Sequence, residues 1–130
     1  MSSIDISTSG LSAQRKRLDI IARNIANAET TRTAKGGPYK RQQVVFTTGR
    51  NGAPGEVEVS RVIQDPRPPR MVYRPGHPDA DQKGFVAMPN VNVMEEMVDM
   101  VSATRSYEAN IAAVNAAKSM VRKALDIVKG

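Results

Sequence analysis

The last third of the sequence constrains the fold most strongly, because residues 91–129 contain neither glycine nor proline. Apolar residues recur there every seven positions, at Val93, Met100, Tyr107, Val114, Val121 and Val128. This spacing predicts one long amphipathic helix. At ~1.5 Å of rise per residue, the helix would be roughly 50 Å long, which is too long for a small globule to fold around.

A second apolar stripe lies near the start of the chain. Ile4, Leu11, Leu18 and Ile25 fall seven positions apart, and the pattern is strongest between Leu18 and Ala28. It predicts a helix that ends near Asn27, a residue suited to a left-handed helix stop. We expect the two helices to pack as a coiled-coil-like pair. Periodicity leaves open whether they pair within one chain or between chains.

Three asparagines interrupt these apolar stripes. Asn24 and Asn27 lie in the first predicted helix, and Asn110 lies in the last one. A polar residue in a helix seam costs stability but fixes the alignment of the helices. We therefore expect Asn24 and Asn27 to face Asn110 across the seam.

The middle of the chain has a different character. All eight prolines and seven of the nine glycines lie in residues 36–89. Residues 42–47 and 55–64 have strand composition, and an Asn-Gly turn signal lies at 51–52 between them. Short strands are also expected at 71–74 and 84–88. The sequence therefore predicts an α+β fold with a terminal helix at 1–28, a β-rich module at 29–93 and a terminal helix at 94–130.

Composition excludes several classes of function. Without cysteine there is no disulfide and no thiol catalysis. No run of about 20 apolar residues is present, so we expect no membrane insertion, and the N-terminus lacks the features of a cleaved signal peptide. The net charge of +6 comes mainly from residues 29–93, which carry ten basic and six acidic residues. Because these charges are scattered among proline and glycine, we expect a solvated or acid-facing surface and no nucleic-acid site.

Catalytic and metal-binding patterns are weak. The single histidine, His77, precedes Asp79 and Asp81 in a segment flanked by prolines, which is typical of a polar turn. Glu95 and Glu96 are adjacent on a helix, so their side chains point about 100° apart and do not converge. The sequence has no nucleophile elbow and no phosphate-binding loop. We expect no enzymatic activity, no cofactor and no metal.

Two terminal motifs carry a family resemblance. Residues 9–31 read SGLSAQRKRLDIIARNIANAETT, and residues 91–120 read VNVMEEMVDMVSATRSYEANIAAVNAAKSM. Together they resemble the N- and C-terminal signatures of bacterial flagellar rod and hook proteins. The stretches at 36–46 and 65–97 point, within that family, to the proximal rod. The resemblance covers nearly the whole chain.

The resemblance implies a structural role. Members are exported unfolded through the flagellar type III apparatus, without a cleaved leader, and assemble into an axial tube that crosses the periplasm. Their terminal helices form the inner core of this tube, and the β module lies outside it. The implied partners are the other proximal rod proteins, the adjacent distal rod proteins, the basal-body components at the base of the rod and the export apparatus.

The expected assembly residues follow from these motifs and from the apolar stripes. In the first helix they are Leu11, Leu18, Ile21, Asn24, Ile25 and Asn27. In the last helix they are Met100, Arg105, Tyr107, Glu108, Asn110, Val114, Met120, Val121 and Leu125. A coiled-coil adaptor or chaperone and a basic nucleic-acid-binding module are the alternatives, and neither accounts for both terminal motifs.

Overall fold

The computed structural model describes residues 3–48 and 57–129 of the chain. Its elements follow in the order α1 (Ser3–Ala26), β1 (Gln42–Thr48), β2 (Val57–Gln64), β3 (Arg70–Tyr73), β4 (Phe85–Met88) and α2 (Val93–Lys129). Two long terminal helices thus flank a small module of two antiparallel hairpins. This arrangement confirms the predicted α+β fold class.

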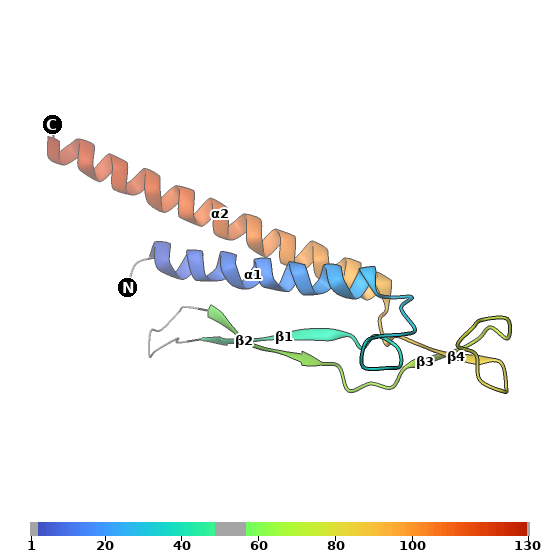
Figure 1. Cartoon of the computed structure of the whole chain (residues 1–130). Helices are drawn as coiled ribbons and strands as arrows, with labels where there is room; N and C mark the ends of the chain where they lie inside the picture. Colours follow the sequence, from blue (N-terminus) through green and yellow to red (C-terminus); the bar gives the residue numbers. More distant parts are fainter. Residues whose placement is uncertain (1–2, 49–56, 130) are drawn as a thin grey trace.

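The two helices lie side by side and run in opposite directions, so both chain ends lie at the same end of the molecule (Figure 1). They therefore pair within one chain, which the periodicity had left open. The side-chain oxygen of Asn92 caps the start of α2 by accepting hydrogen bonds from the backbone N–H groups of Met94 (3.0 Å) and Glu95 (3.3 Å). At the end of α1, the Arg23 carbonyl accepts hydrogen bonds from both the backbone N–H (3.0 Å) and the side-chain nitrogen (2.9 Å) of Asn27.

Strands β1 and β2 form an antiparallel hairpin with a bulge between Val45 and Phe46. The expected Asn-Gly turn at 51–52 lies outside the described residues. This hairpin packs against α1 on the side opposite α2, so α1 lies in the middle of the three layers (Figure 1). The first helix is therefore covered on two sides, by α2 and by the hairpin. Along its length α2 packs mainly on α1.

Strands β3 and β4 form a second hairpin beyond the start of α2, at the end of the molecule remote from the chain termini (Figure 1). Gly84 precedes β4 with a φ of +88°, a left-handed conformation that L-residues with a side chain rarely adopt. The ring of Tyr73 occupies the space that a Cβ at this position would need. Tyr73 and Phe85 then stack edge to face, with 5.4 Å between ring centroids.

The apolar core is small and contains no fully buried aromatic ring among the described residues. Its buried hydrophobic residues are Ala13, Ile20, Ile21, Ala28, Val86, Met88, Val91 and Ala103. Because this core is thin, buried polar contacts carry an unusual share of the packing between the module and the helices. Neither described helix is long and apolar enough to cross a lipid bilayer.

Candidate assembly interface

The second half of α2 extends past the start of α1. Asn110 of α2 lies against Gly10 of α1, and the helices are antiparallel. Counting outward from this contact, Ser3 lies opposite residue 117, so residues 118–129 extend about three turns beyond α1. We call residues 118–129 the overhang of α2. Every residue of the overhang is exposed.

The overhang is apolar on one side. Its exposed apolar residues are Met120, Val121, Leu125, Ile127 and Val128, with exposed fractions from 51% for Val121 to 82% for Val128. At 100° per residue, Val121 and Val128 continue the face on which Ala103 is buried against α1. The overhang therefore repeats the α1-facing surface of α2 at a place where this chain has no helix to cover it.

The start of α2 has a separate exposed apolar surface. Met94 (70% exposed), Met97 (49%), Val98 (66%) and Val101 (54%) are spaced three and four residues apart, so they share one side of the helix. That side is opposite the one on which Glu96 and Ala103 are buried. The helix thus presents two uncovered apolar surfaces, at different ends and on different sides.

Some of the expected assembly residues are covered within this chain, and others are exposed. Ile21 and Asn24 are buried between the helices and β1, whereas Leu11, Leu18, Ile25 and Asn27 are partly buried. On α2, the partly buried residues are Met100, Tyr107, Asn110 and Val114, and the exposed ones are Arg105, Glu108, Met120, Val121 and Leu125. The first helix is thus largely occupied within the chain, and the exposed members lie on α2.

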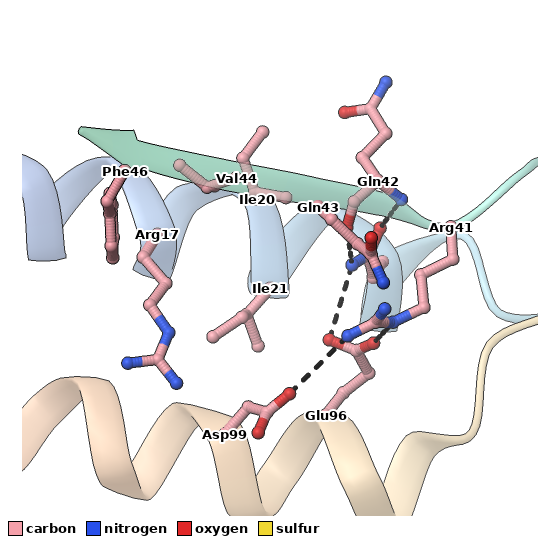
Figure 2. Close-up of a pocket in the computed structure, with 11 residues that line it drawn as sticks. Arg17, Ile20, Ile21, Arg41, Gln42, Gln43, Val44, Phe46, Glu96 and Asp99 are labelled. Carbon is pink, nitrogen blue, oxygen red and sulfur yellow. Dashed lines mark hydrogen bonds and ion pairs between the residues drawn. The ribbon is translucent and has the colours of Figure 1, made fainter. Parts of the chain in front are cut away.

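A buried polar cluster joins the β module to the helix pair. Arg41, which directly precedes β1, forms an ion pair with the fully buried carboxylate of Glu96 on α2 (Figure 2). Its guanidinium also lies 3.2 Å from the Asp65 carboxylate, just after β2, and 3.6 Å from that of Asp99. One arginine therefore connects the ends of both paired strands to α2.

Asn24 extends this cluster to α1. Its side-chain oxygen accepts hydrogen bonds from the Gln42 backbone N–H (3.0 Å) and from the Tyr39 hydroxyl (2.8 Å). Its side-chain nitrogen donates to the Gln42 carbonyl (2.9 Å) and to Glu96 (3.3 Å). Burial raises the pKa of Tyr39, which keeps its hydroxyl protonated as a donor.

Asn90 closes the cluster on the side of β4. It accepts a hydrogen bond from the Arg41 backbone N–H (2.7 Å) and donates to the carbonyls of Asp65 (3.2 Å) and Arg67 (2.9 Å). Hydrogen bonds from Arg67, supported by Arg41, lower the pKa of Asp65 to about 2. The low pKa keeps the Asp65 carboxylate ionised near neutral pH, and the cluster ties α1, α2 and both hairpins together.

The expectation that Asn24 and Asn27 face Asn110 was wrong. Asn24 is occupied by the buried cluster, and the Asn27 side chain donates back to the Arg23 carbonyl of its own helix. Asn110 lies near the other end of the helix pair, against Gly10, and donates to the carbonyl of Ser106 (2.9 Å). The reason is geometric, because antiparallel helices bring Asn24 opposite Glu96 rather than opposite Asn110.

The acidic turn near His77 has a structural arrangement. The Asp79 carboxylate accepts hydrogen bonds from Thr31 (2.6 Å) and Arg32, which lower its pKa, and its backbone N–H donates to His77 Nδ1 (3.0 Å). Asp81 accepts from the backbone N–H groups of Lys83 and Phe85, both at 2.9 Å. In residues 3–48 and 57–129, no three His, Cys, Asp or Glu residues gather as a metal site would require.

Comparison with known proteins identifies the family. A model described as "Flagella basal body rod protein" matches residues 4–32, and one described as "Flagellar basal body rod FlgEFG protein C-terminal" matches residues 82–127. The flagellar basal-body rod protein FlgC of Borreliella burgdorferi is 45% identical, with 99% of this chain and 97% of the relative covered. FlgC of Escherichia coli strain CFT073 is 47% identical over 95% and 93%, and FlgC of Bacillus subtilis is 41% identical over 98% and 97%.

The chain belongs to the FlgC family of flagellar basal-body rod proteins. It is therefore a structural protein of the flagellar basal body and not an enzyme. The two segments matched by the family models contain nearly all of α1 and of α2. In this FlgC-family chain the matched segments thus cover most of the helix pair, and the second one also includes β4 and the overhang up to Ile127.

Sequence reasoning missed the buried cluster of this FlgC-family chain. Neither Arg41 nor Glu96 was among the expected assembly residues, yet their ion pair fixes the module to α2. One signal was available, because Glu96 shares the seven-residue spacing of Ala103, Ala117 and Ala124, which lies three positions after the apolar stripe. A charge at a buried seam position needs a partner of opposite charge, but the sequence offers 19 basic residues and no way to choose Arg41 among them.

Proposed function

We propose that this chain is a structural subunit of the proximal rod and that it assembles through the uncovered surfaces of α2. The observation that carries the proposal is the overhang, whose apolar residues continue the seam beyond α1. A helix from a neighbouring subunit would cover the overhang in the same way that α1 covers the first part of α2. Burying an exposed Leu or Val side chain contributes about 1.5–3 kcal/mol, so five such residues supply a substantial driving force.

The partners in this proposal are the other proximal rod proteins, the adjacent distal rod proteins and the basal-body components at the base of the rod. The subunit would reach the rod through the flagellar type III export apparatus, as an unfolded chain without a cleaved leader. The assembled tube would cross the periplasm, with the helix pair inside and the β module outside. Full-length similarity to FlgC proteins supports the role, and the position of the module on one side of the helix pair suits this arrangement (Figure 1).

A complementation assay tests the proposal. Cells that lack the endogenous gene receive either the wild-type chain or the Leu125→Asp variant, and swimming and isolated basal bodies are compared. A charge at Leu125 would be buried without a partner in every assembled subunit, at a cost of several kcal/mol per site. We expect Leu125→Asp to abolish rod completion while the variant is still exported.

Ser119→Asp is the matched control. Ser119 is exposed on the same overhang but lies on its polar side, about 160° from Val121. The Ser119→Asp substitution introduces the same charge outside the apolar side that is expected to contact the next subunit, so swimming should remain near the wild-type level. Complete rods in Leu125→Asp cells would contradict the proposed use of the overhang.

A further inference from the structure

Gly10 lies in the interior of α1, where glycine is a poor helix former. Its neighbour across the seam explains its presence. A Cβ at this position would lie 2.9 Å from both the side-chain nitrogen and the side-chain oxygen of Asn110. The Asn110 nitrogen is also held by its hydrogen bond to the Ser106 carbonyl (2.9 Å). The amide group therefore fills the space that any side chain at position 10 would occupy.

This contact has a counterpart in the buried cluster, where Asn24 of α1 donates to Glu96 of α2. Gly10 and Asn24 are fourteen residues apart, and Glu96 and Asn110 are also fourteen residues apart. The close approach of Gly10 and Asn110 and the Asn24–Glu96 hydrogen bond thus lie ~21 Å from each other along both helices. We call the end of the helix pair near Gly10, remote from the buried cluster, its open end. Two separated contacts fix both the register of the helix pair and the distance between the helices at this open end.

Apolar contacts alone would not fix the pair in this way. The apolar stripes repeat every seven residues on both helices, so displacement of one helix presents similar side chains to the other. The β module is bonded to α2 through the buried cluster at one end of the pair. Near Gly10 the described residues of the module are bonded to α1 alone, where the Val57 backbone N–H donates to the Ser9 hydroxyl (3.0 Å), so the module does not hold this end of α1 against α2. Without a second specific contact, the Gly10 end of α1 would be free to diverge from α2.

We propose that Gly10 and Asn110 form a second alignment point, which holds the open end of the helix pair and thereby sets how the overhang is presented to the next subunit. The contact acts as a positioning device for assembly. This inference rests on the proposed function, because it assigns importance to the overhang. It predicts that improving the helix propensity of position 10 impairs the protein.

Gly10→Ala tests this directly, because alanine is the better helix former and any loss must come from the contact with Asn110. Pulsed electron paramagnetic resonance on the full-length chain reads the helix separation. The natural sequence has no cysteine, so Ser12→Cys with Ala113→Cys labels the open end at two exposed sites. Ala22→Cys with Ser102→Cys labels the end near the buried cluster as an internal control.

We expect a narrow distance distribution for both label pairs in the otherwise wild-type chain. Gly10→Ala should shift the open-end distance to longer values and broaden it, and should leave the cluster-end distance unchanged. Without labels, the same substitution should cause a loss of swimming. Adding Asn110→Ala makes room for the new methyl group, so the Gly10→Ala/Asn110→Ala chain should regain the narrow open-end distance and should recover swimming at least in part.

Three results would overturn the inference. The first is a broad open-end distribution in the wild-type background, which would mean that no alignment point exists. The second is an unchanged distance and normal swimming in Gly10→Ala. The third is a shifted distance with normal swimming, which would separate alignment from assembly. All three leave the proposed function standing if Leu125→Asp still blocks rod completion, so the two failures are distinguishable.

Discussion

At the scale of single residues, the ion pair between Arg41 and Glu96 carries a large desolvation penalty. The Glu96 side chain is fully buried, and the Arg41 side chain is 14% exposed. Removing two charges from water is repaid only when the geometry is good and the remaining polar atoms are bonded. Both conditions hold, because Asn24, Asp65 and Asp99 also contact the pair. The pair therefore specifies where the module docks more than it adds net stability.

Neutralising Glu96 should be strongly destabilising. Glu96→Gln keeps the size of the side chain but removes the fully buried one of the carboxylates that neutralise the Arg41 guanidinium, so we expect a loss of about 3 kcal/mol in the free energy of unfolding. Urea titration followed by circular dichroism measures the loss. Glu95→Gln, on the exposed side of the same turn, is the control and should change stability by no more than about 0.5 kcal/mol. An equal loss of unfolding free energy in the two variants would show that the buried ion pair is not important for stability.

Asp65 gives the fold a defined response to acid. Hydrogen bonds from Arg67 lower its pKa from 3.8 to about 2 in the folded chain. Because the folded pKa is the lower one, the carboxylate stabilises the fold above pH ~4, and this contribution is lost as the pH falls through about 2. A shift of this size corresponds to stabilisation on the order of 2 kcal/mol. Asp65→Asn should be less stable than the wild type near neutral pH, and the difference should shrink between pH ~4 and pH ~2. A constant difference across urea titrations in that range would contradict the assignment.

At the scale of elements, the two ends of α2 experience different environments. Glu96 and Ala103 are buried against α1 and the module, whereas the whole overhang is exposed. Local opening of a helix costs little where few contacts must break. The same helix should therefore be stable at its start and labile at its end until another chain covers it.

Hydrogen exchange on the isolated full-length chain should show this gradient. We expect strong protection of backbone amides around residues 96–110 and rapid exchange throughout residues 118–129. The first segment packs within the chain and the second does not. Uniform protection along α2 in a dilute monomer would show that the overhang does not depend on a neighbour for its stability.

The helices and strands were largely predictable because their signals are local. The seven-residue spacing located both helices to within two residues at each end, and the four strands were also close to their observed bounds. The contacts between elements were not predictable in the same way. Arg41 and Glu96 are 55 positions apart, and the asparagines could be matched correctly only once the helices were known to pair antiparallel within one chain. From the sequence alone Gly10 is only a poor helix former, because a single sequence does not reveal what lies opposite it.

At the scale of the whole molecule, the two uncovered apolar surfaces of α2 favour an open assembly. One surface lies on the overhang and the other lies at the start of the helix, on a different side. Contacts between two different surfaces of neighbouring subunits are heterologous, and they build a helical array when the rotation does not close into a ring. The chain is thus suited to stacking with other subunits along an axis rather than to a closed dimer.

Removing the overhang should separate folding from assembly. A chain that ends at Ala117 keeps the helix pair, the buried cluster and both hairpins, since all residues of the overhang are exposed. We expect its free energy of unfolding to remain within about 0.5 kcal/mol of the full-length value, as for changes at exposed positions elsewhere. It should nevertheless fail to restore swimming or complete rods in cells that lack the endogenous gene. Urea titration, export of the truncated chain and electron microscopy of basal bodies measure the three properties independently. If the truncated chain folds and is exported but also completes the rod, the subunits must join through another surface, and the outer face at the start of α2, formed by Met94, Met97, Val98 and Val101, is then the next surface to disrupt.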